Sequence, residues 1–464
     1  MTRLSGKDFI ALILAAGKGT RMQSDLPKVL HQLLKKPMLW YPLETFRRMD
    51  FQKRFVVAGY GHDLLEKEFP EDKDDFVIQD EQLGTGHALQ EAWPVITAVQ
   101  AQWLVVANGD TPLVSESSLE QLIFRVTEAG ADLGLLTLNL VHPSGYGRVV
   151  KDNTGRITAV IEARDFDPGL HGPFSGEVNS GIYVFRISSL AEIIFDLDAH
   201  NQQKELYLTQ LISLANDRDM TVLAVSAGNC PELLGINNSS ELVAQEEYLR
   251  SGIVDKMISQ GVIIRNKDQV RIGPEVEIQA GADITGPCEI YGASFVGKGA
   301  RINSHCYIED SSILDSEILS FSHIYKSDIK EQTSIGPFAR LRPGTVMEKG
   351  SKAGNFVEIK NSSIGRYSKV NHLSYIGDTD MAQEVNVGAG TITCNYDGRN
   401  KHRTVIDQQA FIGSNTSLVA PVRIGERSMV GAGSTITFDV PEESLAIARS
   451  RQKNLMQKNP LKKN

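Results

Sequence analysis

An aliphatic residue recurs at every sixth position through most of the second half of this 464-residue chain. One unbroken register consists of Ile272, Ile278, Ile284, Ile290, Val296, Ile302 and Ile308, and another of Ile406, Ile412, Leu418, Ile424, Val430 and Ile436. Ile329, Ile335 and Leu341 keep the same step between them. Neither an α-helical nor a heptad period fits these spacings. The period of six predicts a triangular coil of short strands and turns, a hexapeptide β-helix, with the aliphatic side chains stacked inside it.

The first half of the chain, residues 1–238, follows a different pattern. Apolar runs typical of buried strands occur at 9–16, 54–59 and 103–110. Each is followed by a polar or glycine turn and then by a helical pattern, such as the one at 117–130. This alternation predicts an α/β domain with a Rossmann-like parallel sheet and helices on its faces. In such sheets, ligands bind at the carboxyl ends of the strands.

Residues 239–261 separate the two patterns and predict one amphipathic helix. Serines at the start of this segment can cap the helix, and a glycine at its end can terminate it. The expected organisation is therefore a domain at 1–238, a linker helix at 239–261 and a β-helix domain at 262–464.

Charge and cysteine content exclude several classes of protein. The formal net charge of -9 argues against a general nucleic-acid binder, which carries a basic field. No apolar segment reaches the length of a membrane span. The four cysteines, Cys230, Cys288, Cys306 and Cys394, are widely spaced and form no CxxC motif, which indicates reduced thiols. We therefore expect a cytoplasmic protein with no nucleic-acid or membrane partner.

A glycine loop with two cations, LAAGKGTRM, follows the first predicted strand. Gly17 and Gly19 allow backbone amides to approach an anion, and Lys18 and Arg21 add positive charge. The spacing is that of neither Walker A nor GxGxxG. Lys28, a few residues downstream in LPKVL, is near enough to reach the same phosphates. The loop therefore predicts a phosphate site.

Further polar residues occur beside the other predicted strands. Asp110 ends a strand and is placed to hold a hard cation such as Mg²⁺. Gln79 precedes a second glycine loop, EQLGTGHA at 81–88. Taken singly, these residues have plainer explanations, since Asp110 could cap a helix and Glu162 could be a solvated carboxylate. Together they favour a nucleotide site.

The motifs GTRM with LPK, QLGTGHA, GYGR and INN resemble those of sugar nucleotidyltransferases, and most closely the N-acetylglucosamine-1-phosphate uridylyltransferases. The resemblance implies nucleotide contacts from Leu14, Ala15, Ala16 and Gly17, uracil recognition by Gln79, Gly84 and Thr85, and triphosphate binding by the catalytic cations Arg21 and Lys28. It implies sugar contacts from Gly147, Glu162 and Asn179, and a Mg²⁺ site at Asp110 and Asn237. Asn108 departs from the family, because some members carry Tyr there.

Two polar breaks interrupt the six-residue repeat. Residues 371–375 contain His372 and Tyr375, and the loop at 393–404 has no aliphatic period, so it must project from the coil. A coil that serves only as a spacer or an oligomerisation device needs neither. Residues 380–388 lack the Ile-Gly pair of a regular hexad, which predicts one irregular coil.

The motifs GPFARLRPGT, GNFVEIKNS, HLSYIGD, NVGAGTITCNYDG and GAGSTIT resemble, in order, those of the left-handed β-helix acetyltransferases that act on glucosamine-1-phosphate. The resemblance implies a left-handed coil, and His372 as the general base that accepts a proton from the sugar amine. It implies sugar-phosphate contacts from Arg342, Lys360, Tyr375 and Asn386, and acetyl-CoA contacts from Asn395, Tyr396, Ser414, Ala432 and Arg449. Members of this family are homotrimers with sites shared between neighbouring coils.

The leading hypothesis is a bifunctional enzyme. It would transfer acetyl from acetyl-CoA to glucosamine-1-phosphate, and then uridylyl from UTP to N-acetylglucosamine-1-phosphate with release of pyrophosphate. One alternative is a monofunctional pyrophosphorylase whose β-helix is only structural. The presence of His372 and the 393–404 loop disfavours it, because a structural coil needs neither. Another is a regulatory subunit without activity, which should have lost Lys28 or Asp110, and both are present.

Overall fold

The computed structural model describes residues 6–456, and the chain divides into two compact units, Met1–Leu249 and Arg250–Asn464. Helix α8 (Ser239–Ser259) occupies the predicted linker segment, and the division falls within it. Gly261 follows with a φ of 95°, a left-handed conformation that ends helices and favours glycine. None of the helices in the described residues is long and apolar enough to cross a membrane.

A twisted mixed sheet forms the centre of the N-terminal unit. Its strands are, in spatial order, β11 (Val222–Ser226), β7 (Leu133–Asn139), β10 (Glu177–Arg186), β6 (Trp103–Asn108), β1 (Phe9–Leu14), β4 (Lys53–Ala58) and β5 (Phe76–Ile78). An antiparallel ribbon of β8 (Arg148–Lys151) and β9 (Ile157–Ile161) branches from β10. The α/β fold is confirmed, with one difference: β10 runs antiparallel to β6 and β7. Every residue of β10 except Arg186 is buried, and an apolar run does not reveal strand direction.

Helices cover both faces of this sheet. They are α1 (Trp40–Arg48), α2 (His62–Glu68), α3 (Thr85–Ala98), α4 (Glu116–Glu128), α5 (Pro168–His171), α6 (Ile187–Leu190) and α7 (Leu211–Asp217). Side chains of β1 alternate between the two cores, since Phe9, Ala11 and Ile13 pack with α1 and α4 whereas the residues between them pack with α3 and α7. A short hairpin of β2 (Gln32–Leu33) and β3 (Lys36–Pro37) precedes α1.

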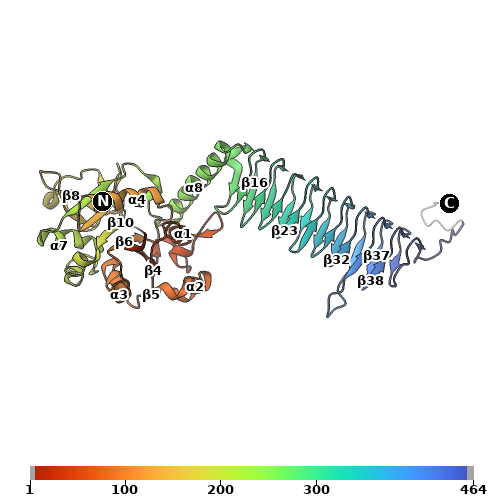
Figure 1. Cartoon of the computed structure of the whole chain (residues 1–464), viewed down its shortest axis with the longest axis horizontal. Helices are drawn as coiled ribbons and strands as arrows, with labels where there is room; N and C mark the ends of the chain where they lie inside the picture. Colours follow the sequence, from red (N-terminus) through yellow and green to blue (C-terminus); the bar gives the residue numbers. More distant parts are fainter. Residues whose placement is uncertain (1–5, 457–464) are drawn as a thin grey trace, which may run out of the picture. The chain divides into compact units, whose positions relative to one another are not determined.

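The C-terminal unit is a parallel β-helix in which successive coils add one strand to each of three sheets (Figure 1). The first sheet contains β12 (Ile263–Arg265), β15 (Asp283–Thr285), β18 (Arg301–Ile302), β21 (Glu317–Ile318), β24 (Ser334–Ile335), β27 (Lys352–Asn355), β30 (Lys369–His372), β33 (Asn386–Val387), β36 (Phe411–Ile412), β39 (Met429–Val430) and β41 (Leu445–Ala446). The second contains β13 (Val270–Ile272), β16 (Cys288–Tyr291), β19 (Cys306–Glu309), β22 (His323–Tyr325), β25 (Arg340–Leu341), β28 (Glu358–Lys360), β31 (Tyr375–Gly377), β34 (Ile392–Cys394), β37 (Ser417–Val419) and β40 (Thr435–Ile436). The third contains β14 (Glu277–Ile278), β17 (Phe295–Val296), β20 (Ser312–Ile313), β23 (Ser327–Ile329), β26 (Thr345–Met347), β29 (Ser363–Ile364), β32 (Thr379–Met381), β35 (Thr404–Ile406) and β38 (Val422–Ile424).

The aliphatic residues of the six-residue repeat form the core of the coil, as predicted. All of them are buried except Ile278, which is partly buried against the same core. The middle coils shorten some steps to five residues, as between Ile308, Ile313 and Ile318, and the strands stay in register. Burial of one apolar side chain per strand therefore sets the fold of this half.

One prediction about the coil was wrong. Residues 380–388 form a regular coil, because Met381 on β32 and Val387 on β33 take inward positions and pair in register with their neighbours. A flexible methionine fills the space of an isoleucine, so the absence of an Ile-Gly pair does not disturb the stack. All four cysteines are free thiols, in agreement with the sequence.

Truncation of one inward residue should destabilise the β-helix far more than truncation of its outward neighbour. Ile302 is 1% exposed and Arg301 beside it is exposed. We expect Ile302→Ala to lower the free energy of unfolding by about 2–5 kcal/mol, because it leaves a cavity in a core to which each strand contributes one side chain. Arg301→Ala should change it by no more than about 0.5 kcal/mol. Urea unfolding measures both, and equal losses would contradict this account of the core.

Candidate active sites

A cavity of about 420 Å³ opens in the N-terminal unit where the carboxyl ends of β1 and β6 lie side by side. Its wall contains most of the nucleotide residues predicted from the sequence: Leu14, Ala15, Ala16, Gly17, Arg21, Lys28, Gln79, Gly84, Thr85, Asn108, Asp110 and Asn237. These residues come from five separate stretches of the chain. The fold therefore brings the predicted nucleotide set together at one edge of the sheet, as expected for an open α/β sheet.

A cluster of charged and amide groups lies in this cavity. The Nζ atom of Lys28 is 2.5 Å from Oδ2 of Asp110 and 2.8 Å from Oδ1 of Asn237. Arg21 donates from Nη2 to the same Asn237 oxygen, at 2.7 Å. Lys28 is only 9% exposed, so its charge is held between these two oxygen groups and away from bulk water. The cluster is thus a preformed arrangement of cations and oxygen donors.

Local backbone features hold this cluster in place. Gly19 has a φ of 66°, and a Cβ there would lie 2.5 Å from Cβ of Lys28, so glycine is required. The amide of Gly109 donates to the carbonyl of Leu14 at 2.9 Å, which joins the turn after β6 to the end of β1. Asn237 donates its backbone N–H to Glu241 in the first turn of α8, at 2.6 Å.

The other end of the cavity is formed by Gln79 and the start of α3. Gln79 follows β5, and its Nε2 atom donates to the carbonyl of Gly84 at 3.1 Å. Gly84 has a φ of 114°, and a Cβ there would lie 2.4 Å from the carbonyl oxygen of Leu206. The glycine thus permits the close approach of the α3 turn to the 206 region, and places Thr85 at the cavity wall.

Gly147, Glu162 and Asn179, the predicted sugar residues, form a separate group that the cavity-lining set does not include. Asn179 donates its backbone N–H to the carbonyl of Gly147 at 2.9 Å. A Cβ on Gly147 would lie 3.6 Å from Oε1 of Glu162, and that oxygen accepts a hydrogen bond from Thr209 at 3.0 Å. Burial raises the pKa of Glu162. The three residues therefore lie close together around the Glu162 carboxyl group, whose ionised form is disfavoured by burial.

The C-terminal unit gathers cations at the end of β28. Lys360 ends this strand, and Lys401 approaches it from the projecting loop. The pKa of Lys360 is lowered, first by its contact with Lys401 and then by burial and the charge of Arg342. Cations held this close together are suited to an anion such as phosphate. Sequence reasoning missed Lys401, because the loop contains several cations and no period indicates which of them faces the coil.

Polar groups next to these cations support the loop. Asp378 accepts hydrogen bonds from Asn361 and Asn395. Burial alone would raise the pKa of Asp378, but these hydrogen bonds outweigh it and the pKa is lowered. A Cβ on Gly377 would lie 2.5 Å from the hydroxyl of Tyr375 and 2.9 Å from Nδ2 of Asn395. Tyr375 and Asn395 therefore lie beside one another, next to the strand that carries Lys360.

His372 lies at the end of β30, at the turn that leads into the second sheet, and its side chain is exposed. Its carbonyl accepts from Ser374 Oγ at 2.8 Å, which fixes the turn. Asn386 lies on the next strand of the same sheet. The hydroxyl of Tyr396 turns back onto its own loop and donates to Gly398 at 2.8 Å.

The remaining predicted acetyl-CoA residues follow the same turn on later coils. Gly433 donates to the carbonyl of Ser414 at 2.7 Å, and Arg449 Nη1 donates to the carbonyl of Ala432 at 2.7 Å. Ser414, Ala432 and Arg449 thus form a row along the coil, beyond the turn at His372. A row of this kind offers an extended surface for a long ligand.

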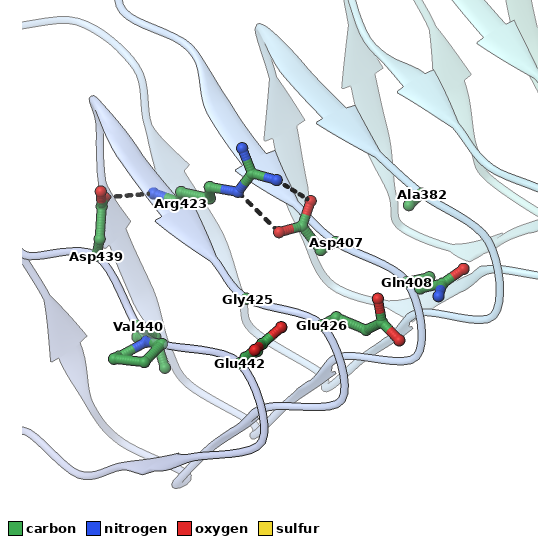
Figure 2. A pocket seen from close by; sticks show the side chains of 10 residues that line it. Ala382, Asp407, Gln408, Arg423, Gly425, Glu426, Asp439, Val440 and Glu442 are labelled. Carbon is green, nitrogen blue, oxygen red and sulfur yellow. Dashed lines mark hydrogen bonds and ion pairs between the residues drawn. The ribbon is translucent and has the colours of Figure 1, made fainter.

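A larger cavity, of about 610 Å³, lies elsewhere on the coil and contains none of the predicted site residues (Figure 2). Arg423, the one cation among the described residues of its wall, is already engaged by two of the four carboxylates there, so these residues offer no free positive charge. Arg423 donates to both carboxylate oxygens of Asp407, at 2.8 and 3.0 Å, and its backbone N–H donates to Asp439 at 2.8 Å. We therefore assign no chemistry to this cavity.

The buried carboxyl of Glu162 predicts a measurable pH dependence of stability. Because the pKa of Glu162 is raised in the folded chain, the folded state binds the proton more tightly than the unfolded state, and stability is lost as pH rises from the ordinary glutamate value through the raised pKa. Glu162→Gln cannot ionise, so it removes this loss of stability, and its amide oxygen can still accept the hydrogen bond from Thr209. We expect it to melt above wild type at neutral pH, with a difference that shrinks as pH falls.

Melting temperatures across this pH range test the expectation, with the exposed Glu120→Gln as the matched control. A Glu162→Gln variant that melts below wild type at neutral pH would contradict it.

Family models match both halves of the chain. Residues 11–161 match the MobA-like NTP transferase domain, and residues 403–437 match the bacterial transferase hexapeptide repeat. The first match covers most of the sheet that carries the nucleotide cavity. The second covers the later coils, including the row at Ser414 and Ala432.

Curated relatives match nearly the whole chain. The protein from Oleidesulfovibrio alaskensis is 48% identical over 96% of this chain and 97% of its own length. Relatives from Nitratidesulfovibrio vulgaris and Carboxydothermus hydrogenoformans are 47% and 44% identical, over 97% and 96% of this chain and 98% of their own lengths. All three are named bifunctional protein GlmU. With its nucleotidyltransferase half, its hexapeptide half and this coverage, the chain belongs to the family of bifunctional GlmU proteins.

Proposed function

We propose that the chain makes UDP-N-acetylglucosamine in two steps, one in each half. The 262–464 domain transfers acetyl from acetyl-CoA to glucosamine-1-phosphate. The 1–238 domain then transfers uridylyl from UTP to the N-acetylglucosamine-1-phosphate formed, and pyrophosphate leaves. The observation that carries this proposal is a cluster of cations in each half, around Lys28 and around Lys360, within a chain that matches proteins named bifunctional over nearly its whole length.

In uridylyl transfer, a phosphate oxygen of the sugar-1-phosphate attacks the α-phosphorus of UTP in line, and no covalent enzyme intermediate is needed. The protein must hold two anions together and neutralise the charge that spreads over the phosphate oxygens. Arg21 and Lys28, which already converge on Asn237, are suited to this role. Gly147, Glu162 and Asn179 would hold the sugar, and Gln79, Gly84 and Thr85 the uracil.

Asp110 and Asn237 suit a Mg²⁺ ion. Their side-chain oxygens both lie within hydrogen-bond distance of one cationic atom, Nζ of Lys28, so they converge on a point where a hard cation could be held. Mg²⁺ takes few protein ligands and completes its shell with water and phosphate oxygens, which fits a site with two protein oxygens. When bound, the ion would neutralise charge on the phosphates.

In acetyl transfer, His372 would accept a proton from the sugar 2-amine as the amine attacks the thioester. Histidine suits this role because its ordinary pKa lies near neutral pH. Lys360, Arg342 and the newly recognised Lys401 would hold the sugar phosphate, with Tyr375 and Asn386 on the sugar. Asn395, Tyr396, Ser414, Ala432 and Arg449 would contact acetyl-CoA.

We also propose a homotrimer in the cytoplasm. Phe321, Phe338 and Phe356 form an exposed ladder on one corner of the coil, with successive ring centroids 4.9 and 5.2 Å apart. Exposed Leu373 occupies the equivalent turn of the next coil, directly after His372. Contiguous exposed apolar surface beside a predicted site supports a neighbouring coil that packs there. The four free thiols are compatible with a reducing compartment.

The two activities should be separable by single substitutions. We expect His372→Ala to lower the release of CoA thiol from acetyl-CoA and glucosamine-1-phosphate by about 100-fold or more, because the general base is lost. Pyrophosphate release from UTP and N-acetylglucosamine-1-phosphate should stay at the wild-type rate in the same preparation. The two partial assays measure these effects directly.

The reciprocal control is Lys28→Ala, which should lower pyrophosphate release by about 100-fold or more and leave thiol release unchanged. A folded wild-type chain that releases no thiol, yet forms pyrophosphate, would leave the β-helix as a scaffold and favour the monofunctional alternative.

A further inference from the structure

A relay of three side chains leads away from the predicted uracil end of the nucleotide cavity. Nε2 of Gln79 lies 2.9 Å from Nδ1 of His87, and Nε2 of His87 lies 3.1 Å from Oε1 of Glu91. Gln79 follows β5, whereas His87 and Glu91 lie one turn apart on α3. The roles of His87 and Glu91 are not explained by the chemistry proposed above.

The orientation of the Gln79 amide follows from its surroundings. Its nitrogen donates to the carbonyl of Gly84, which can only accept, so the amide group cannot be turned around without the loss of this bond. Gln79 is 3% exposed, and its backbone N–H is held by the carbonyl of Ala58 at 2.8 Å. The amide oxygen receives no hydrogen bond from any residue within 6–456, and the side chain lines the cavity. Gln79 therefore offers a bound base an acceptor.

The tautomer of His87 follows in turn. A hydrogen bond from the Gln79 amide nitrogen requires an unprotonated Nδ1, so a neutral ring carries its proton on Nε2. Nε2 is the atom that faces the carboxylate of Glu91, which can only accept when ionised. Glu91 thus favours the tautomer in which His87 accepts from Gln79. With the proton on Nδ1 instead, two donors would face one another, and the amide would be driven to present its nitrogen to the cavity.

The relay sits on a rigid support. Gly86 donates its backbone N–H to the carbonyl of Leu206 at 2.7 Å, and Thr85 Oγ1 accepts from the amide of Leu208 at 3.0 Å. A Cβ on Gly86 would lie 2.6 Å from a methyl carbon of Leu197, so this turn of α3 packs without spare room. The ring of His87 is therefore held in position by a fixed helix turn.

We propose that His87 and Glu91 are positioning residues that set the base preference of the site, uracil over cytosine. Uracil carries a proton on N3 and can donate it to the Gln79 oxygen. Cytosine has a lone pair at N3, which would meet that oxygen as a second acceptor. A wrong base that brings a second buried acceptor against the Gln79 oxygen is rejected more strongly than a base that merely fails to form one hydrogen bond. The proposal rests on the uridylyl transfer proposed above, in which Gln79 contacts the base.

The test compares UTP with CTP. Pyrophosphate release with N-acetylglucosamine-1-phosphate is measured for the full chain, and kcat/KM for UTP is divided by kcat/KM for CTP. We expect His87→Ala to lower this ratio by about tenfold or more, because the Gln79 amide nitrogen then keeps only its bond to Gly84 and the amide turns more readily. His87→Asn, whose Oδ1 can take the place of the Nδ1 acceptor, should keep the ratio within about threefold of wild type.

Glu91 provides a second, independent pair of variants. Glu91 lies near the surface, with its side chain 44% exposed, so its truncation tests the relay even if His87→Ala does not fold. Glu91→Ala should lower the UTP-to-CTP ratio, whereas Glu91→Gln, which keeps an acceptor oxygen for Nε2, should preserve most of it. Release of CoA thiol by the same preparations serves as the control for intact protein.

The possible results distinguish failure of the His87–Glu91 relay from failure of the proposed uridylyl transfer. Equal losses of UTP and CTP turnover in His87→Ala or Glu91→Ala would indicate a merely structural role and overturn the relay, while the uridylyltransferase assignment would stand. A wild-type chain that forms no pyrophosphate from UTP would overturn both.

Discussion

The inward aliphatic residue at about every sixth position is the constraint on which the C-terminal half depends. Each strand of the three sheets contributes one inward side chain to a narrow core, so the coil can accept extra residues only at a turn. The 393–404 loop is such an insertion: Thr393 at its start and Ile406 after its end are both buried, and Thr404 pairs in register with Thr379. The chain therefore gains a polar loop that carries Lys401 without a break in the stack. The residues that we propose for acetyl transfer lie on turns of the coil and at positions that face away from its core.

In the N-terminal half, an ion pair allows charged side chains to lie inside a cavity. Lys28 and Asp110 neutralise one another inside a cavity where either alone would be costly to hold. The triphosphate and the cation that we propose would each take one partner of this ion pair, so the arrival of one favours the arrival of the other. The separate cation clusters in the two halves fit the two transfers that we propose, with the sugar phosphate as the common substrate class.

Much of this architecture could be predicted from the sequence, because both folds repeat a simple pattern of burial. The aliphatic step predicted the coil, and the residues that the glycine-loop motifs singled out, Lys28 and Asp110 among them, line one cavity. The antiparallel direction of β10 could not be predicted, since an apolar run is the same in both directions. The regular coil at 380–388 was not predicted, because Met381 takes the inward position where the repeat usually has isoleucine. Lys401 and the contact between His87 and Gln79 arise from folding of separate segments, and no spacing in the sequence indicates them.

Two independent sites that act in series should complement one another when two variants that each lack one activity are mixed. Lys28→Ala and His372→Ala are each supplied with glucosamine-1-phosphate, acetyl-CoA, UTP and Mg²⁺, alone and together, and UDP-N-acetylglucosamine is measured by mass spectrometry. We expect almost no product from either variant alone and sustained synthesis from the mixture, since the acetylated sugar phosphate made by one variant is used by the other. A mixture as inactive as its components, or full synthesis by either variant alone, would contradict this expectation.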